Sequence, residues 1–294
     1  MQIHCKYNII LSIRKVYLGT NKVPKISFSS PSFWFLCKVL VLIVILSPVV
    51  HANKYTLVIE PTFPPEQGRQ VYEPLRQWLQ KKTGHDIEII IDNSYYFYWR
   101  KANSNRMPDF TLDAPHIAAF RAKKKNYTAI ATTIEPLSFH LIALDEPAPG
   151  QSVQDFMVSK KIVMLPSPSL ASIFFNQWFT DLFASPIKNV KVLSWQETVE
   201  VIFDGGAVAA IVPDWMFNLY PNFTSLMQSR ELPGATFMVS PNVSQDVREN
   251  FQKALLSLID DEAAYDILTE LNTEGFKKPD SSEYDELIKL LPIR

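Results

Sequence analysis

Two serines stand directly before a long apolar segment and could contact an anion. Ser167 and Ser169 precede or open residues 169–183, whose pattern predicts a helix. The first turn of a helix carries unpaired backbone N–H groups and a partial positive charge, and serine hydroxyls add further donors, so this position suits an oxyanion. Serine is equally a favoured helix cap in the absence of any ligand. The pattern therefore allows two interpretations, a ligand contact and a plain cap.

Aromatic side chains form a second group with the potential to bind a ligand. The densest cluster is residues 95–99, where helical spacing must bury some of the rings in a core. Trp195 and Trp215 stand at predicted helix starts in the second half of the chain, and each is more often a core side chain than a ligand platform. An indole at a ligand site would favour a solute with an organic or cationic portion, through stacking or cation–π attraction.

Asp113, His116 and Asp214 are polar residues of types that bind ligands. Asp113 and His116 together invite a metal, but zinc sites use three or four ligands that are mostly His or Cys. After residue 52 the chain has three histidines and no cysteine, so we expect no metal site. Asp214 follows Pro213, where it could hold a ligand amine or simply cap a helix.

The sequence lacks the motifs of common catalytic sites. The 294 residues contain no Gly-x-Ser-x-Gly nucleophile elbow, no Walker phosphate loop and no dinucleotide-binding glycine pattern. The acidic run at residues 260–262 fits a solvated turn between helices. We therefore expect no catalytic residue, no cofactor and no enzymatic activity.

The N-terminal residues predict export. The first 59 residues contain no acidic side chain, and six bases precede a continuous apolar run at residues 39–46. Pro48 follows, and small residues occupy the −3 and −1 positions before a cleavage point after Ala52, which completes a secretory signal. The run is shorter than the roughly 20 apolar residues that span a membrane. Residues 1–52 are thus predicted to be a cleavable signal peptide with a long basic leader, the alternative being an uncleaved anchor over residues 33–50.

The charge and cysteine content of the exported chain exclude several classes of protein. Residues 53–294 hold 23 basic and 30 acidic residues, a net charge of about −7, which argues against nucleic-acid binding. Both cysteines lie in the leader, so a disulfide cannot stabilise the exported fold. With 47% apolar residues, the chain is rich enough for two hydrophobic cores.

Predicted strands and helices alternate along the exported chain, which indicates α/β units with largely parallel sheets. The strands expected in a first unit are residues 55–60, 86–91, 110–113 and 128–133. The strands expected in a second unit are residues 139–144, 161–165, 190–193 and 207–212. A further strand at 235–239 precedes a tail with predicted helices at 247–259, 263–271 and 282–291. Ligands of such sheets bind beyond the carboxyl ends of the strands, and two facing units would form a cleft there.

Nearly the whole exported chain, from Tyr55 to Leu291, resembles the phosphate/phosphite/phosphonate-binding proteins of ABC importers. The resemblance is strongest in residues 71–84, 109–115 and 276–287. That family has the two-lobed type II periplasmic binding fold, an α/β architecture with an interlobe ligand cleft and here a helical C-terminal tail.

The resemblance implies a division of the chain into two lobes. In the family the chain crosses twice between lobes, and the tail returns to the first. Residues 53–137 and 235–294 would therefore form lobe one, and residues 138–234 would form lobe two. Hinges are expected near residues 134–138 and 232–235.

The resemblance also implies ligand contacts in both lobes. Tyr96 matches a tyrosine that begins the second helix of lobe one and is our choice for the cleft. His116 lies near a second tyrosine position, which Ala118 occupies here. In lobe two the family's anion-binding Ser/Thr-rich turn corresponds to the segment with Ser167 and Ser169, which lacks the family's glycine.

Two more lobe-two positions complete the predicted site. A Ser-His pair of the family corresponds to Ser194 and Trp195, and an acidic residue corresponds to Asp214. The predicted ligand-binding residues are Tyr96, Asp113, His116, Ser167, Ser169, Trp195 and Asp214.

The sequence thus predicts an exported, periplasmic solute-binding protein that captures a small anionic, phosphonate- or phosphate-like ligand by hinge closure. The resemblance implies an ABC permease in the inner membrane as partner, and we expect a monomer. A ligand-sensing module that presents its closed state to a membrane receptor is an alternative, and a secreted enzyme is a less favoured one.

Overall fold

The computed structural model describes residues 53–291. The predicted signal peptide, residues 1–52, lies outside the described residues. The first part of the described chain alternates strands and helices in the order β1 Lys54–Ile59, α2 Pro65–Thr83, β2 Asp86–Ile91, α3 Tyr95–Asn103, β3 Phe110–Asp113, α4 Pro115–Lys125 and β4 Thr128–Thr133. Among residues 53–291, no helix has the length and apolar character needed to cross a membrane.

The alternation continues in the second part and ends in a mostly helical tail. The second part contains β5 Phe139–Ala143, α5 Val153–Met157, β6 Lys161–Val163, α6 Leu170–Trp178, β7 Ile187–Asn189, α7 Trp195–Phe203, β8 Ala209–Pro213, α8 Asp214–Asn218 and β9 Thr224–Gln228. The tail contains β10 Thr236–Val239, α9 Gln245–Leu256, α10 Tyr265–Glu270 and β11 Phe276–Lys277, with 3₁₀ turns at Leu258–Asp260, Glu262–Ala264, Ser281–Tyr284 and Leu287–Leu290.

Two separate sheets organise these strands, and they share one topology apart from the additional edge strand β11. The six-stranded sheet has the order β11-β4-β10-β3-β1-β2, and the five-stranded sheet has the order β7-β6-β8-β5-β9. In the six-stranded sheet β1, β2 and β3 are parallel, and in the five-stranded sheet β6, β7 and β8 are parallel. The strand that has just crossed from the other sheet (β10 or β5) joins antiparallel to its two neighbours. Strands of the first sheet come from residues 54–133 and 236–277, and those of the second from residues 139–228. We keep lobe one (53–137 with 235–294) and lobe two (138–234) as a working division.

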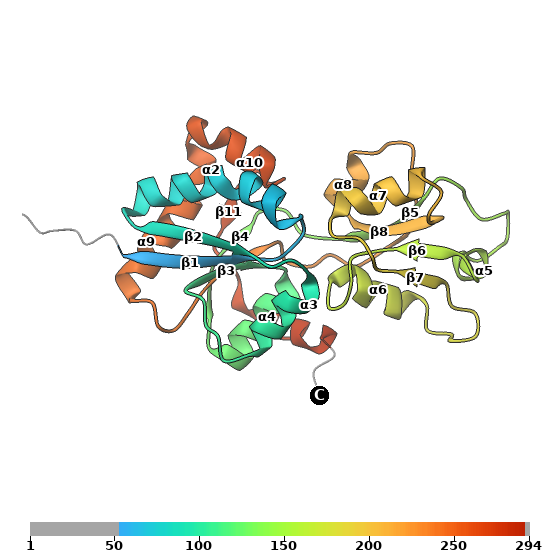
Figure 1. Ribbon diagram of the computed structural model, residues 1–294, viewed down its shortest axis with the longest axis horizontal. Helices are drawn as coiled ribbons and strands as arrows, with labels where there is room; N and C mark the ends of the chain where they lie inside the picture. Colours follow the sequence, from blue (N-terminus) through green and yellow to red (C-terminus); the bar gives the residue numbers. More distant parts are fainter. Residues whose placement is uncertain (1–52, 292–294) are drawn as a thin grey trace, which may run out of the picture. The chain divides into compact units, whose positions relative to one another are not determined.

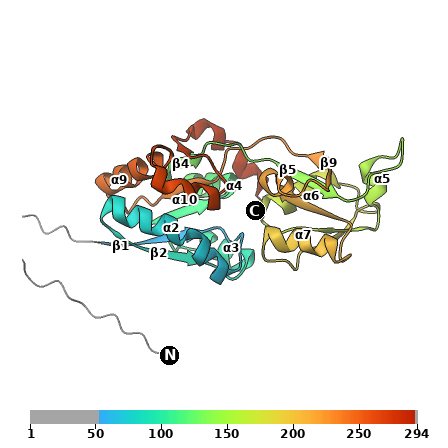
Figure 2. The same ribbon diagram turned by 90° about the horizontal axis from the view of Figure 1, so that it is seen from above.

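Helices cover both faces of each sheet. In Figures 1 and 2, α2, α9 and α10 lie on one face of the six-stranded sheet, and α3 and α4 lie on the other. In the five-stranded sheet, α7 and α8 lie opposite α6 (Figure 1). The central strands β5 and β8 are buried along their whole length. This burial fits strands that are covered on both faces.

The helix α2 shows how the sequence sets the bounds of an element. Its buried stripe includes Leu75, Trp78 and Leu79, which recur at helical spacing. Gly84 ends the helix with φ 72° and donates its N–H to Gln80 O at 2.9 Å. A left-handed residue at this position favours glycine.

Several predicted boundaries are wrong. The helix predicted to reach Phe183 ends at Trp178, and Leu182 and Phe183 are 89% and 102% exposed. An apolar run that has no surface to pack against gains nothing from continuing as a helix. In place of the strand predicted at 190–193, the chain forms β7 just before these residues. The segment predicted as a helix at 282–291 consists of two 3₁₀ turns.

The two crossing segments between the sheets lie side by side. Leu137 and Leu232 form an isolated antiparallel bridge, with reciprocal N–H···O bonds of 2.8 and 2.9 Å. Both leucine N–H groups are therefore satisfied by the other crossing. One hydrophobic cluster packs within lobe one, whereas a second contains buried residues of both lobes, so apolar contact crosses between the sheets.

Candidate ligand pocket

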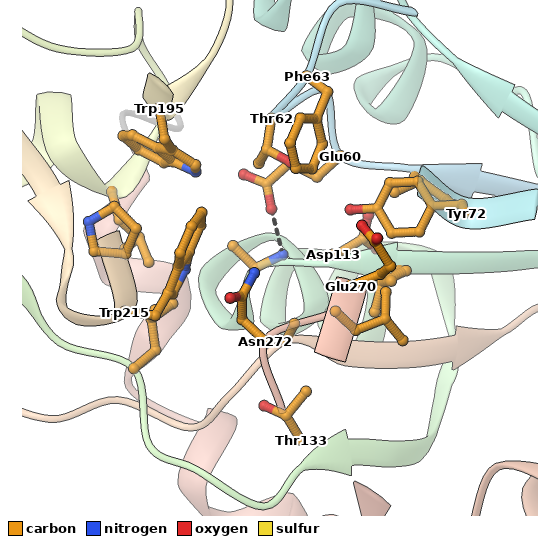
Figure 3. Close-up of a pocket in the computed structure, with 18 of the residues that line it drawn as sticks. Glu60, Thr62, Phe63, Tyr72, Asp113, Thr133, Trp195, Trp215, Glu270 and Asn272 are labelled. Atoms are coloured by element: carbon orange, nitrogen blue, oxygen red, sulfur yellow. Dashed lines mark hydrogen bonds between the residues drawn. The ribbon is translucent and has the colours of Figure 1, made fainter. Parts of the chain in front are cut away.

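A cavity of about 140 Å³ lies between the two lobes, at the ends of β1, β3 and β8. Lobe one contributes residues that follow β1 and β3. Lobe two contributes residues in the first turns of three helices: Leu170, Trp195 and Trp215. Figure 3 shows the lining side chains. Carboxyl ends of strands are where α/β sheets bind ligands. A larger hollow of about 350 Å³ lies wholly in lobe one, beside α3.

The lining of this interlobe pocket is aromatic and acidic. Its aromatic members are Phe63, Tyr72, Tyr95, Phe139, Trp195, Trp215 and Phe276. Its acidic members are Glu60, Asp113 and Glu270. No lysine, arginine or histidine of residues 53–291 lines it.

Glu60 extends into the pocket directly after β1. Its Oε2 accepts the Ala114 N–H at 2.7 Å, its Oε1 accepts the Tyr95 hydroxyl, and its own N–H donates to Leu112 O at 3.0 Å. Burial, assisted by the charge of nearby Asp113, raises the pKa of Glu60 to about 7, against the opposing effect of the two hydrogen bonds. The carboxyl group is thus fixed in position and titrates near neutral pH.

Asp113 is held in a buried ion pair rather than left free for a ligand. Arg121 Nε donates to Asp113 Oδ2 at 2.6 Å, and the Tyr98 hydroxyl donates to Oδ1. Both members of the pair are almost fully buried. Burial acts to lower the pKa of Arg121, but the Asp113 carboxylate holds it above its ordinary value. The charge of Asp113 is therefore compensated within lobe one.

Two indoles form the lobe-two wall. Trp195 is the first residue of α7, directly after Ser194, whose Oγ accepts the Glu197 N–H at 3.1 Å. Its ring packs edge-on against Phe139, with centroids 5.6 Å apart. Trp215 is the second residue of α8. In Figure 3, both indoles extend from lobe two toward the side on which Glu60 lies.

Comparison with known proteins shows the family to which the chain belongs. Residues 57–284 match the family model described as ABC transporter, phosphonate, periplasmic substrate-binding protein. This chain belongs to that family. Its members are transport proteins that bind a substrate in the periplasm, and the predicted resemblance is confirmed. No curated protein matches the sequence.

Solved structures of phosphonate-binding proteins share the fold. PhnD1 of Prochlorococcus marinus, solved with methylphosphonate, has a TM-score of 0.67 at 12% identity, over 81% of this chain and 96% of that one. A binding-protein component of an ABC phosphonate transporter from Pseudomonas aeruginosa has a TM-score of 0.66 at 12% identity, over 81% and 85%. A Xanthomonas citri protein bound to ATP has a TM-score of 0.62 at 12% identity, over 81% and 95%. The predicted two-lobed periplasmic binding fold is confirmed.

The predicted ligand-binding residues of lobe one differ in their positions relative to the pocket. Tyr96 is 63% exposed and does not line the pocket, whereas its neighbour Tyr95 does. Tyr96 therefore lies outside this pocket, because the start of α3 turns the preceding residue toward it. Asp113 lines the pocket but is paired with Arg121. His116 is fully buried outside the lining.

The predicted contacts from lobe two divide in the same way. Trp195 lines the pocket, and Asp214 lies between two lining residues without lining it. Ser167 is exposed. Ser169 is buried as the cap of α6: its Oγ donates to Leu165 O at 2.7 Å and accepts the Ser172 N–H at 3.2 Å. The hydroxyl is thus used by the helix itself.

His116 connects the two lobes. Its Nε2 lies 2.8 Å from the Pro168 carbonyl, and its Nδ1 has no partner among the described residues. Burial lowers the pKa of His116 to about 4, so the ring is neutral at neutral pH and Nε2 carries the proton that is donated.

Sequence reasoning missed the acidic centre of the pocket. Glu60 is the last residue of the first predicted strand and precedes Pro61, a position that the rule for strand ends would have selected. Glu270 and Asn272 reach the pocket from the tail, which gives no comparable local signal.

Proposed function

We propose that this chain is the solute-binding subunit of an ABC importer, which captures one small solute in the interlobe pocket by hinge closure. The observation that supports this is a cavity walled by both lobes. A ligand that contacts both walls favours the closed arrangement, because closure requires contacts that the open state lacks.

Several features of this role follow the family. The chain acts in the periplasm as a monomer after removal of its signal peptide, and its closed form docks on a permease in the inner membrane. It performs no chemistry on the solute. Family membership favours a phosphonate or phosphate-like anion, and the related protein of P. marinus is bound to methylphosphonate.

The residues proposed to contact the solute are those that the pocket brings together. They are Glu60, Tyr95 and Phe63 from lobe one and Trp195 and Trp215 from lobe two. Asp113, which is paired with Arg121, is proposed not to bind the solute.

The test is to purify the exported chain from the periplasm, identify any bound solute by mass spectrometry and screen candidates by thermal shift. The panel includes phosphate, phosphite, alkylphosphonates, sulfate, amino acids and alkylammonium compounds. A ligand at a hundred times its Kd adds about 2.7 kcal/mol of stability. A Thr62→Trp variant, which fills the pocket, should lose the shift, and Thr180→Trp, at an exposed site, should keep it.

The proposal fails if no solute stabilises the protein, or if Thr62→Trp binds as well as the unmodified chain. Turnover of a bound solute would instead indicate an enzyme.

A further inference from the structure

We propose that the solute carries a compact organic cation, an alkylated or quaternary ammonium group, held between the Glu60 carboxylate and the indoles of Trp195 and Trp215. This inference rests on the proposed function, because it names the chemical class of the solute that occupies the same pocket.

The charges around the cavity favour a cation. Three acidic residues and no basic residue of the described chain line it. Asp113 is compensated by Arg121, but Glu60 and Glu270 form no ion pair with any residue in the described range. Both Glu60 oxygens accept one hydrogen bond, and each can accept another. A bound cation would supply the missing countercharge.

The aromatic side chains provide the remaining walls. Trp195 and Trp215 stand on the lobe-two side, and Phe63 and Tyr95 flank Glu60 on the lobe-one side. Figure 3 shows the Trp195 ring and the Glu60 carboxylate directed toward each other across the cavity. Aromatic faces attract alkylated ammonium groups, which bury their methyl groups and keep a diffuse charge.

Some of the groups that could bind an anion are already used within the protein. The N-terminus of α4 faces the pocket at Ala114, but the Glu60 carboxylate accepts that N–H. The hydroxyls of Ser169 and Ser194 cap α6 and α7. A phosphonate placed here would face Glu60 without any side-chain cation, an arrangement that like-charge repulsion disfavours.

The volume limits the size of the cation. About 140 Å³ is close to the roughly 150 Å³ of an engineered cavity that holds benzene. Choline, a small alcohol with a trimethylammonium group, is therefore a suitable probe. Its neutral isostere 3,3-dimethylbutan-1-ol has the same shape without the charge.

The experiment measures binding of three probes to the full exported chain by calorimetry: choline, 3,3-dimethylbutan-1-ol and methylphosphonate. We expect choline to bind at least about tenfold more tightly than the isostere, and methylphosphonate not to displace it. Because this comparison changes only the probe, it does not depend on whether a variant folds.

Variants then locate the interaction. Glu60→Gln should weaken choline about tenfold or more while changing the affinity for the isostere less than threefold. Trp215→Leu should weaken choline by a similar factor. Glu249→Gln, at an exposed carboxylate of α9, is the matched control and should bind as the unmodified chain does.

Equal affinity for choline and its isostere would overturn the inference, as would binding of methylphosphonate that displaces choline. In either case capture of a small solute in the pocket would stand. The absence of binding by all three probes would also overturn the inference. The proposed capture of a solute is tested separately, by the solute recovered from the periplasmic protein.

Discussion

The carboxyl group of Glu60 is ionised less readily than an exposed glutamate because it lies in a pocket without a countercharge. Tyr95, Tyr72 and Asp113 are the titratable groups that act on it or on its partners, and none of the three is a cation. Its folded pKa of about 7 exceeds its ordinary value of 4.5. The folded protein therefore binds a proton that the unfolded chain releases between these two values.

We expect this difference to appear in the pH dependence of stability. Between about pH 4.5 and pH 7 the unfolded state binds fewer protons at Glu60, so the free energy of unfolding should fall with rising pH. Relative to Glu60→Gln, the fall should be on the order of 1–3 kcal/mol. Urea unfolding of both proteins at several pH values measures it, with Glu249→Gln as control. Identical pH profiles for the chain and Glu60→Gln would contradict the assignment.

The Asp113–Arg121 pair should contribute to stability rather than to affinity. Replacing Asp113 by Asn leaves Arg121 charged, buried and without its counterion. We expect a loss of about 3–5 kcal/mol in the free energy of unfolding. Asp285→Asn breaks the exposed Lys123–Asp285 pair and should have a much smaller effect. A stable Asp113→Asn variant that has lost ligand binding would show that Asp113 contacts the solute directly.

At the scale of elements, α3 shows that a shift of one position along a helix decides whether a side chain faces the pocket. Successive residues of a helix are separated by about 100° around its axis, so Tyr95 faces the pocket and Tyr96 faces solvent. We expect Tyr95→Phe, which loses the hydroxyl that donates to Glu60, to change solute affinity severalfold. Tyr96→Phe should leave it unchanged. Calorimetric titration of the two variants decides between them, and the opposite result would restore Tyr96 to the site.

The start of α6 offers a test between capping and ligand binding. Ser169 Oγ satisfies the Ser172 N–H and donates to Leu165 O, so Ser169→Ala should lower the free energy of unfolding by about 1–2 kcal/mol. We expect solute affinity to change less than threefold in calorimetry. Unchanged stability with a large loss of affinity would favour the anion-contact interpretation of this serine.

Much of the fold could be predicted because strands such as β1, β2 and β3 carry their own local pattern. The helical stripe of α2 and its stop at Gly84 are equally local. The end of α6 was missed because Phe179, Leu182 and Phe183 look like a continuing apolar face, and only the tertiary structure shows that nothing packs on the last two. The return of residues 235–294 to lobe one was implied by the family resemblance. The position of β10 between β3 and β4 was not predicted, since no local pattern specifies a partner so distant in sequence.

The site was less predictable than the fold because a residue lines the pocket only if its side chain points into it. Trp195 and Asp113 were placed at strand ends or helix starts, and both line the pocket. Ser169 and Asp214 follow the same rule but do not line the pocket, and the Ser169 hydroxyl is used as the cap of α6. Phe63 required knowledge of which loop lines the cavity, whereas Glu60 lies at a strand end and could have been selected by the rule.

At the scale of the whole molecule, the His116–Pro168 hydrogen bond joins lobe one to lobe two beside the pocket. His116→Leu removes the donor and leaves the carbonyl without this partner. We expect the closed state to lose about 1 kcal/mol, which lowers solute affinity about fivefold. Small-angle scattering should show a larger radius of gyration for this variant at subsaturating ligand. His140→Leu, which loses a contact inside lobe two, should not change affinity, and equal effects of both would contradict the assignment.

The bridge between Leu137 and Leu232 has a mechanical consequence. Because the two connectors are hydrogen-bonded to each other, we expect them to rotate together as one two-stranded ribbon. Rotation of one connector would be transmitted to the other, which would restrict sliding of one lobe along the other. The solute would then be enclosed by a hinge rotation of the two lobes about this ribbon.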